Sequence, residues 1–275
     1  HSSVKNNDIT TNGDSNFNQG ILLFYFSTNN TIINNKISTN GGQTNIGIKL
    51  EYDVSNNTIK ENRITTNGKS AYNSGIDLNG RNNGNFIINN IISTNGTNNN
   101  YGYYSSDSVN NFISGNDFST NGNTTNYGIF TYDSNNTIVN NKISTNCISG
   151  DNYGVYLISG SYNNLTLNTI STNGGSSNYG VYIYNTKNII KSNTITTNGN
   201  SDNHGIALGS YASNNSITDN VVSTSGANSH SLYLSPLRAV KKIIHTNNTF
   251  NSNILSSSGL DLFFNSTNYS GSKML

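Results

Sequence analysis

The acidic residues of this 275-residue chain are few, and their densest group lies with two cations between residues 49 and 81. The group consists of Lys49, Glu51, Asp53, Asp77 and Arg81. Lys49, Glu51 and Asp77 each fall two or four residues after a recurring glycine, so in extended strands they point to one face. Carboxylates beside a cation can exchange protons with a substrate or hold Ca²⁺ through their oxygens. Charges of both signs are also typical of a solvated surface, which is the interpretation we favour over catalysis and Ca²⁺ binding.

Asp107 and Asp133 form a second acidic pair, because they occupy the same turn position in two successive sequence repeats. Stacking of the repeats would bring their carboxylates together, which makes them candidate metal ligands. The same turn position elsewhere holds short polar residues or glycine: Gly80, Ser159, Asn185 and Ser210. Because turns favour residues of this kind, we expect turn chemistry here rather than a metal site.

Aromatic residues form a third candidate site, a strip of outward-pointing rings on four successive repeats. The strip consists of Tyr104, Phe130, Tyr156 and Tyr182, with Tyr132 and Tyr184 two residues further along. Sugar rings stack on exposed aromatic surfaces, and a contiguous apolar patch marks a binding site. The alternative is that Tyr and Phe are present for their strand propensity and form cross-strand ladders.

Composition excludes several classes of protein. Lys and Arg number 14 against 13 Asp and Glu, so no overall field would attract nucleic acid or an anionic membrane. A single Cys147 excludes a disulfide framework, and four scattered His residues make no zinc pattern. The longest apolar run is six residues, too short for a transmembrane helix. With 59 Asn, 39 Ser and 29 Thr in a neutral chain, we expect an extracellular or cell-surface setting.

A repeat of about 26 residues runs along most of the chain. Its glycine column is Gly20, Gly47, Gly75, Gly102, Gly128, Gly154, Gly180 and Gly205. One apolar column is Ile32, Ile59, Ile87, Ile113, Ile138, Leu165, Ile190 and Ile217, and another follows each member five residues later. An Asn precedes every member of both apolar columns by two residues, and this regularity excludes chance.

Residues 47–74 illustrate the structure that one repeat predicts. Residues 47–52 alternate apolar and polar, as a half-buried strand does, and residues 58–60 and 63–65 predict two more short strands. An apolar period of 2 within a segment and 5 between segments excludes helices. The sequence therefore predicts an all-β, single-stranded parallel β-helix of about ten coils, with three short strands per coil and Asn ladders at the corners. The insertions that follow each Ser-Thr-Asn-Gly predict a row of loops along one edge.

The repeat resembles the right-handed parallel β-helix of the pectate-lyase-like superfamily, and most closely its short-repeat branch. That branch includes carbohydrate-binding and sugar-hydrolase proteins and NosD-like periplasmic proteins, and residues 128–146 carry its pattern as GIFTYDSNNTIVNNKISTN. The resemblance implies the fold over residues 1–226. It also implies that an enzyme of this type would use acidic residues with Ca²⁺ and an Arg or Lys base, or clustered Asp.

Motifs of those enzymes are missing, since Asn-Thr-Asp, Asp-Asp and Gly-His-Gly do not occur in the sequence. We therefore expect a non-catalytic, extracellular surface or adhesion protein that contacts a polysaccharide or cell-surface glycan through the aromatic strip. A polysaccharide lyase or glycoside hydrolase is the first alternative, and a structural subunit of a filament or surface layer is the second. End-to-end self-association is a further expectation.

The regular repeat divides the chain into two parts of one domain. Residues 1–226 predict regular coils, with the chain opening in the middle of a coil. Beyond residue 226 the register loosens, and Pro236 and the basic residues 238–242 replace the usual turn. We expect residues 227–275 to form modified terminal coils and an edge-blocking cap.

Overall fold

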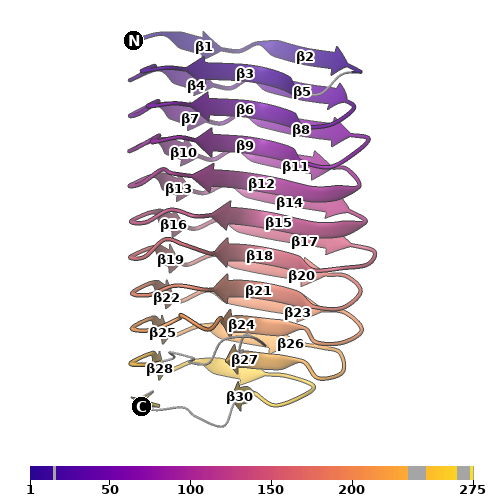
Figure 1. Ribbon diagram of the computed structural model, residues 1–275, viewed down its shortest axis with the longest axis vertical. Coiled ribbons are helices and arrows are strands. Elements are labelled where there is room, and N and C mark those ends of the chain that lie inside the picture. The colour runs from indigo at the N-terminus through magenta and orange to yellow at the C-terminus, as the bar shows by residue number, and fades with distance from the viewer. Residues whose placement is uncertain (15–16, 235–245, 265–272, 275) are drawn as a thin grey trace.

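A computed structural model describes residues 1–14, 17–234, 246–264 and 273–274 of the chain. Every regular element in these residues is a strand, and the strands form three parallel sheets stacked into a solenoid (Figure 1). Sheet A consists of β1 (Ser3–Lys5), β4 (Thr31–Ile33), β7 (Thr58–Lys60), β10 (Phe86–Ile88), β13 (Phe112–Ser114), β16 (Thr137–Val139), β19 (Asn164–Thr166), β22 (Ile189–Lys191), β25 (Ser216–Thr218), β28 (Thr249–Asn251) and β31 (Lys273–Met274). Sheet B consists of β2 (Asp8–Gly13), β5 (Lys36–Gly41), β8 (Arg63–Gly68), β11 (Ile91–Asn95), β14 (Asp117–Gly122), β17 (Lys142–Cys147), β20 (Thr169–Asn173), β23 (Thr194–Asn198), β26 (Val221–Thr224) and β29 (Ile254–Ser256). Sheet C consists of β3 (Asn18–Phe24), β6 (Asn45–Glu51), β9 (Asn73–Asn79), β12 (Asn98–Ser106), β15 (Thr124–Thr131), β18 (Asn152–Leu157), β21 (Asn178–Ile183), β24 (His204–Leu208), β27 (His230–Leu234) and β30 (Leu262–Phe264).

Each coil contributes one strand to each sheet, and equivalent residues of successive coils are paired. Ile87 is the partner of Ile59 on one side and of Ile113 on the other, which confirms the stacking predicted from the apolar columns. β7 has the predicted bounds, whereas β8 extends to Gly68 and is longer than the predicted strand at residues 63–65. The all-β parallel solenoid and its three strands per coil are confirmed. The loops between sheets B and C form the predicted row along one edge (Figure 1).

The core is a continuous apolar column because the inward residues of every coil meet their equivalents above and below. Ile59, Ile87, Ile113, Leu165 and Ile190 are completely buried. The recurring glycines are required by close approach between sheets. A Cβ on Gly75 would lie 2.1 Å from Cγ2 of Ile92 in sheet B and 2.7 Å from the carbonyl oxygen of Gly102. A methyl group at Gly75 would therefore require sheet C to move away from sheet B.

The predicted Asn ladders are present at both corners. At the corner before sheet B, the backbone N–H and the Nδ2 group of Asn90 both donate to Oδ1 of Asn116, each at 2.9 Å. The Nδ2 group of Asn116 in turn donates to Oδ1 of Asn141 at 3.0 Å and to the carbonyl oxygen of Ile87 at 2.8 Å. Each side chain therefore satisfies buried backbone groups of two coils, which explains why every repeat has Asn at this position.

Two further Asn ladders were not predicted. One is buried at the start of sheet C and includes Asn73, whose Nδ2 donates to Oδ1 of Asn100 at 3.0 Å. The other is more exposed at the end of sheet B, where Nδ2 of Asn121 donates to Oδ1 of Asn95 on the preceding coil at 3.1 Å. The two ladders hold the ends of the loops that connect sheets B and C.

A row of threonines faces inward in sheet B, and it explains the extra length of these strands. Its members are Thr39, Thr66, Thr94, Thr120, Thr145, Thr172, Thr197 and Thr224, all of them buried. Their Oγ1 atoms have no hydrogen-bond partner. The methyl groups of Thr197 and Thr224 face the glycine column of sheet C, since a Cβ on Gly180 or Gly205 would lie 3.4 Å from their Cγ2 atoms.

The three sheets continue past residue 226. β27, β28 and β29 pair with β24, β25 and β26, so this region keeps the coil path as far as it is described. Pro236 and residues 238–242, on which the predicted cap depends, lie outside the described residues, and the cap stays a prediction. Among the described residues, no helix has the length and apolar character needed to cross a membrane.

Candidate functional site

Two rows of side chains cover the outer face of sheet C. The outer row contains Leu22, Lys49, Asp77, Tyr104, Phe130, Tyr156, Tyr182, Ala207 and Tyr233, each paired with the next. The second row contains the residues that precede the recurring glycines, Gln19, Ile46, Ser74, Tyr101, Tyr127, Tyr153, Tyr179 and His204, and it continues with His230, which precedes Ser231. Both rows are aromatic over four successive coils, from β12 to β21, and together they form an aromatic band.

Rings of the second row stack face to face along the solenoid. The ring centroids of Tyr101, Tyr127 and Tyr153 follow one another at 5.1 Å with nearly parallel planes, and Tyr179 continues the stack at 5.0 Å. The ring of His204 lies 5.5 Å from that of Tyr179 but is tilted by 54°, so the parallel stack ends at Tyr179. Burial, assisted by the charge of His230, lowers the pKa of His204 to about 4. No function was predicted for this row from the residues. Its signal is the recurrence of Tyr immediately before glycine.

The predicted strip is less exposed than expected. Tyr104, Phe130, Tyr156 and Tyr182 point outward as alternation requires, but rings of the second row pack against them, for example Tyr127 on Phe130 at 4.8 Å. Phe130 retains only 6% exposure, and the three tyrosines are half-buried. The expectation of exposed rings therefore fails for Phe130, while the three tyrosines keep part of their surface exposed. Bulky neighbours in two rows cover one another's faces.

Tyr132 and Tyr184, two residues beyond the outer row, differ from each other. Tyr132 is 39% exposed, and its ring meets Phe130 edge-on at 5.1 Å. Tyr184 is half-buried and contacts Tyr211 at 5.3 Å on the following coil. Tyr132 therefore extends the aromatic band towards the N-terminal coils, whereas Tyr184 belongs to its opposite end.

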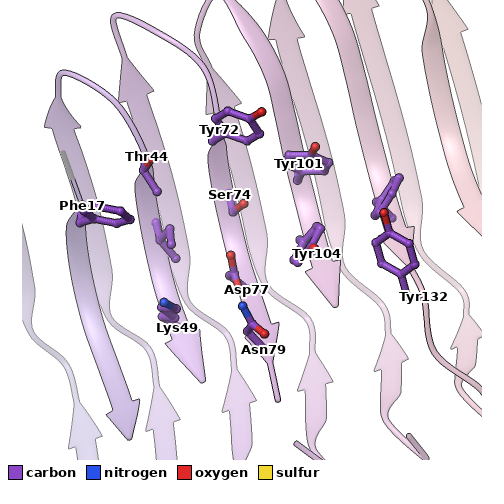
Figure 2. Close-up of a pocket in the computed structure, with 12 residues that line it drawn as sticks. Phe17, Thr44, Lys49, Tyr72, Ser74, Asp77, Asn79, Tyr101, Tyr104 and Tyr132 are labelled. Carbon is purple, nitrogen blue, oxygen red and sulfur yellow. The ribbon is translucent and has the colours of Figure 1, made fainter. Parts of the chain in front are cut away.

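A groove of about 410 Å³ opens where the aromatic band ends (Figure 2). Both rows change there to smaller or polar residues. On the preceding coil, β9 places Ser74 beside Tyr101 and Asp77 beside Tyr104. The tyrosine rings thus form a wall beside a polar floor. Tyr72, from the loop before β9, and Tyr132 complete the wall. The groove brings together two of the predicted sites, the aromatic strip and the acidic group.

Asp77 is the acidic residue of the groove. Its direct partner on β6 is Lys49, whose Nζ lies 2.9 Å from Oε1 of Glu51. Oδ1 of Asp77 is buried and accepts no hydrogen bond. Burial raises the pKa of Asp77 to about 7, Lys49 opposes the rise and Glu51 adds to it. At neutral pH this carboxyl is therefore poised between its acid and its ionised form.

Asp53 and Arg81 of the predicted acidic group lie apart from Asp77. Nη2 of Arg81 donates to Oδ2 of Asp53 at 3.0 Å, and the guanidinium is exposed. Both residues belong to the corner that follows sheet C, where each has a positive φ. Arg81 does not line the groove that holds Asp77; it lines a second cavity of about 510 Å³. The acidic group is thus divided between the groove and the corner.

Asp107 and Asp133 both line that second cavity, and Tyr132 lines both cavities. Asp133 is buried, and its Oδ1 accepts a hydrogen bond of 2.8 Å from the backbone N–H of Ser108. Burial raises the pKa of Asp133 to about 6, against hydrogen bonds that lower it. Asp107 is exposed, and its charge is the smallest of these contributions. In the described part of the chain, no three His, Cys, Asp or Glu residues are grouped to hold a metal ion.

Comparisons with known proteins agree with the solenoid architecture. Residues 69–222 match the family described as right handed beta helix region. No curated protein matches the sequence.

Three solved structures are similar in fold. The A-module of Azotobacter vinelandii mannuronan C-5 epimerase AlgE6 aligns with a TM-score of 0.43 and 10% identity, over 97% of this chain and 90% of that one. The AlgE4 A-module of the same organism aligns with a TM-score of 0.38 and 13% identity, over 99% and 91%. The Dettilon tailspike protein gp208 aligns with a TM-score of 0.34 and 13% identity, over 84% and 62%.

Proposed function

This chain belongs to the right-handed β-helix family, and from that premise we propose that it is a non-catalytic polysaccharide-binding protein of the cell surface or the extracellular space. The observation that carries the proposal is the groove at the end of the aromatic band, where tyrosine rings stand against a polar floor. Sugar rings have an apolar face and a rim of hydroxyl groups. The groove offers tyrosine rings to the apolar face and a polar floor to the hydroxyl groups.

The tyrosines supply the contact surface for the sugar face. Tyr72 and Tyr132 are the exposed members of the wall, and their rings are held by the loop before β9 and by the corner after β15. If aromatic pair energies transfer to sugar stacking, each ring contributes about 0.5–1.5 kcal/mol. Two such contacts support weak binding at one site, and a polymer that engages many copies on a surface gains avidity.

The cell-surface setting rests on composition. The chain is nearly neutral, more than half of it is Asn, Ser, Thr and Gly, and it contains one cysteine. A solenoid stabilised by backbone pairing and Asn ladders needs no disulfides, which suits exposure to changing redox conditions. Protease accessibility of the protein on intact cells tests this part of the proposal, because a protein enclosed within the cell stays protected.

The binding experiment compares a panel of soluble polysaccharides by affinity electrophoresis and calorimetry. We expect the double variant Tyr72→Ala/Tyr132→Ala to weaken binding about tenfold, since two ring contacts are lost. Tyr162→Ala is the matched control, because Tyr162 is equally exposed but contacts Lys187 on a different corner. Equal binding by wild type and the double variant, with both folded, would exclude the groove as the binding site.

A polysaccharide-acting enzyme is the second candidate, and the pKa of Asp77 favours it. A carboxyl with a pKa of about 7 beside Lys49 is suited to general acid or base catalysis at neutral pH. Product release from lyase or hydrolase substrates that disappears in Asp77→Asn would establish catalysis. A wild-type protein that binds a polymer and leaves its length unchanged would support the binding function instead.

A further inference from the structure

We infer that the groove selects an uncharged, hydroxyl-rich polysaccharide, and that Asp77 accepts hydrogen bonds from its hydroxyl groups. The inference rests on the proposed function and names the class of ligand for the same site. It follows from the charges at the groove, from the unpartnered oxygen of Asp77 and from the neighbours that face this residue.

The charges at the groove are unfavourable for an anionic sugar. Lys49 is the only cation among the described residues that line it, and its ammonium group is paired with Glu51 at 2.9 Å. The side chains of this ion pair are 12% and 18% exposed, so water screens the pair poorly and its geometry is held firmly. A sugar carboxylate would meet Asp77, with no unpaired cation among the described lining residues to offset it. Arg81, whose guanidinium is exposed, lines the neighbouring cavity and is paired with Asp53.

The polar floor is matched to hydroxyl groups. Oδ1 of Asp77 is buried and accepts no hydrogen bond, which is costly for a carboxylate oxygen. Thr44, Ser74 and Asn79 line the same groove with neutral groups that both donate and accept. Figure 2 shows Ser74, Asp77 and Asn79 in line along one strand, beside the rings of Tyr101 and Tyr104. A sugar stacked on the rings therefore presents its hydroxyl rim to this strand.

The groups that face Asp77 make its ionisation respond to the ligand. On β6 these groups are Lys49 and Glu51, which form the ion pair, and on β12 the facing group is Tyr104, while Tyr103 is a nearby core side chain on the opposite face. Burial raises the pKa of both tyrosines, so they stay neutral over the physiological range. Hydroxyl donors stabilise the ionised form of Asp77 and lower its pKa from about 7.

The sign of the pH dependence follows from this shift. The complex binds fewer protons than the free protein, so affinity for an uncharged polymer rises with pH up to the pKa of the free carboxyl and then levels off. If the pKa in the complex lies well below 6, the affinity gain between pH 6 and pH 8 is about tenfold. An anionic polymer gives the opposite sign, because ionised Asp77 repels it.

The experiment measures binding of soluble mannan, dextran and mixed-linkage glucan, and of polygalacturonate and alginate, between pH 5.5 and pH 8.5. We expect one or more uncharged polymers to bind about ten times more tightly at pH 8 than at pH 6. In Asp77→Asn this pH dependence should disappear, since an amide does not titrate. Asp117→Asn, which removes an exposed carboxylate paired with Lys142 on sheet B, should keep it.

The outcomes distinguish failure of the proposed binding function from failure of the inference about the class of ligand. Preferential binding of the anionic polymers, weakened by Tyr72→Ala/Tyr132→Ala, would overturn the inference and leave the proposed function standing. Binding of an uncharged polymer with no pH dependence in the wild type would remove Asp77 from recognition. Failure of every polymer to bind would overturn the proposed function, and the inference with it.

Discussion

Tyr104 on β12 is the direct cross-strand partner of Asp77 on β9, so an aromatic ring and a carboxyl occupy neighbouring positions in one outward row. The row is aromatic from Tyr104 to Tyr182 and charged or aliphatic from Asp77 back to Leu22. The groove opens between β12 and β9, because the outward side chains of β9 are smaller than the aromatic rings of β12. The burial that raises the pKa of Asp77 occurs at this same place.

Phe130→Ala should destabilise the protein, although the residue points outward. The ring of Phe130 is 6% exposed and contacts Tyr127, Tyr132 and Tyr156 at 4.8–5.2 Å. We expect a loss of about 3 kcal/mol in the free energy of unfolding, as for a core Phe. Tyr132→Ala should cost less than half as much. Denaturant unfolding followed by circular dichroism measures both, and equal stability of wild type and Phe130→Ala would contradict the packing described here.

Asn116→Ala tests the buried ladder. The substitution leaves the backbone N–H and the side-chain amide of Asn90 without their acceptor, and we expect a cost of about 2–4 kcal/mol. Asn121→Ala is the matched control on the more exposed ladder, where the lost partners are the side chains of Asn95, Ser119 and Asn146 and water can replace them. Similar unfolding midpoints for the two variants would show that the buried ladder contributes no more than the exposed one.

Thr120→Val should stabilise the solenoid. Thr120 is fully buried, and its Oγ1 has no hydrogen-bond partner. Replacing the hydroxyl with a methyl group removes a desolvated polar atom and keeps the shape, so we expect a gain of about 1 kcal/mol. Thr120→Ala should destabilise instead, because it leaves a cavity. A thermal midpoint of Thr120→Val below that of the wild type would contradict this account of the threonine row.

Asp133 should make stability depend on pH in a direction unusual for a carboxyl. Its folded-state pKa of about 6 lies above the ordinary value of 3.8, so the fold binds its proton more tightly than the unfolded chain does. The stabilisation is fully present below about pH 4 and is lost as the pH rises to about 6, a change of about 3 kcal/mol. The measurement is the difference in unfolding free energy between wild type and Asp133→Asn from pH 3.5 to pH 7.5. Contributions shared by both proteins, including that of His204, cancel in this difference, and a flat profile would refute the shift.

Much of the fold could be predicted from the sequence, because a solenoid repeats local patterns. Asn116 and Asn141 occupy one column of the repeat, and in the structure they bond to each other. The two additional ladders, at Asn73 and Asn121, were missed because the repeat was analysed relative to its apolar columns. The inward threonines were missed for a similar reason, since Thr is read as a surface residue when its strand is assumed to end at residue 65.

The candidate site was predicted only in pieces. Asp77 and Tyr104 were each singled out, but as members of two unrelated groups, and Tyr72 was not considered at all. Arg81 and Asp53 were placed with Asp77, although they lie at the corner that follows sheet C, outside the groove. Alternation along a strand gives the direction of each side chain and says nothing of the size of its neighbours on the next coil.

The residue pattern alone predicts the strands, their parallel register and the two corner ladders, because each coil pairs with a near copy of itself and the pairing rule is the same at every coil. Which outward residues are exposed and which carboxyls are desolvated depends on how side chains of successive coils pack against one another. Exposure of Phe130 and burial of Asp77 depend on rings and loops contributed by residues about 26 positions away in either direction. Desolvation depends on all of these atoms together, and the residue pattern of one strand does not include the atoms of the neighbouring coils.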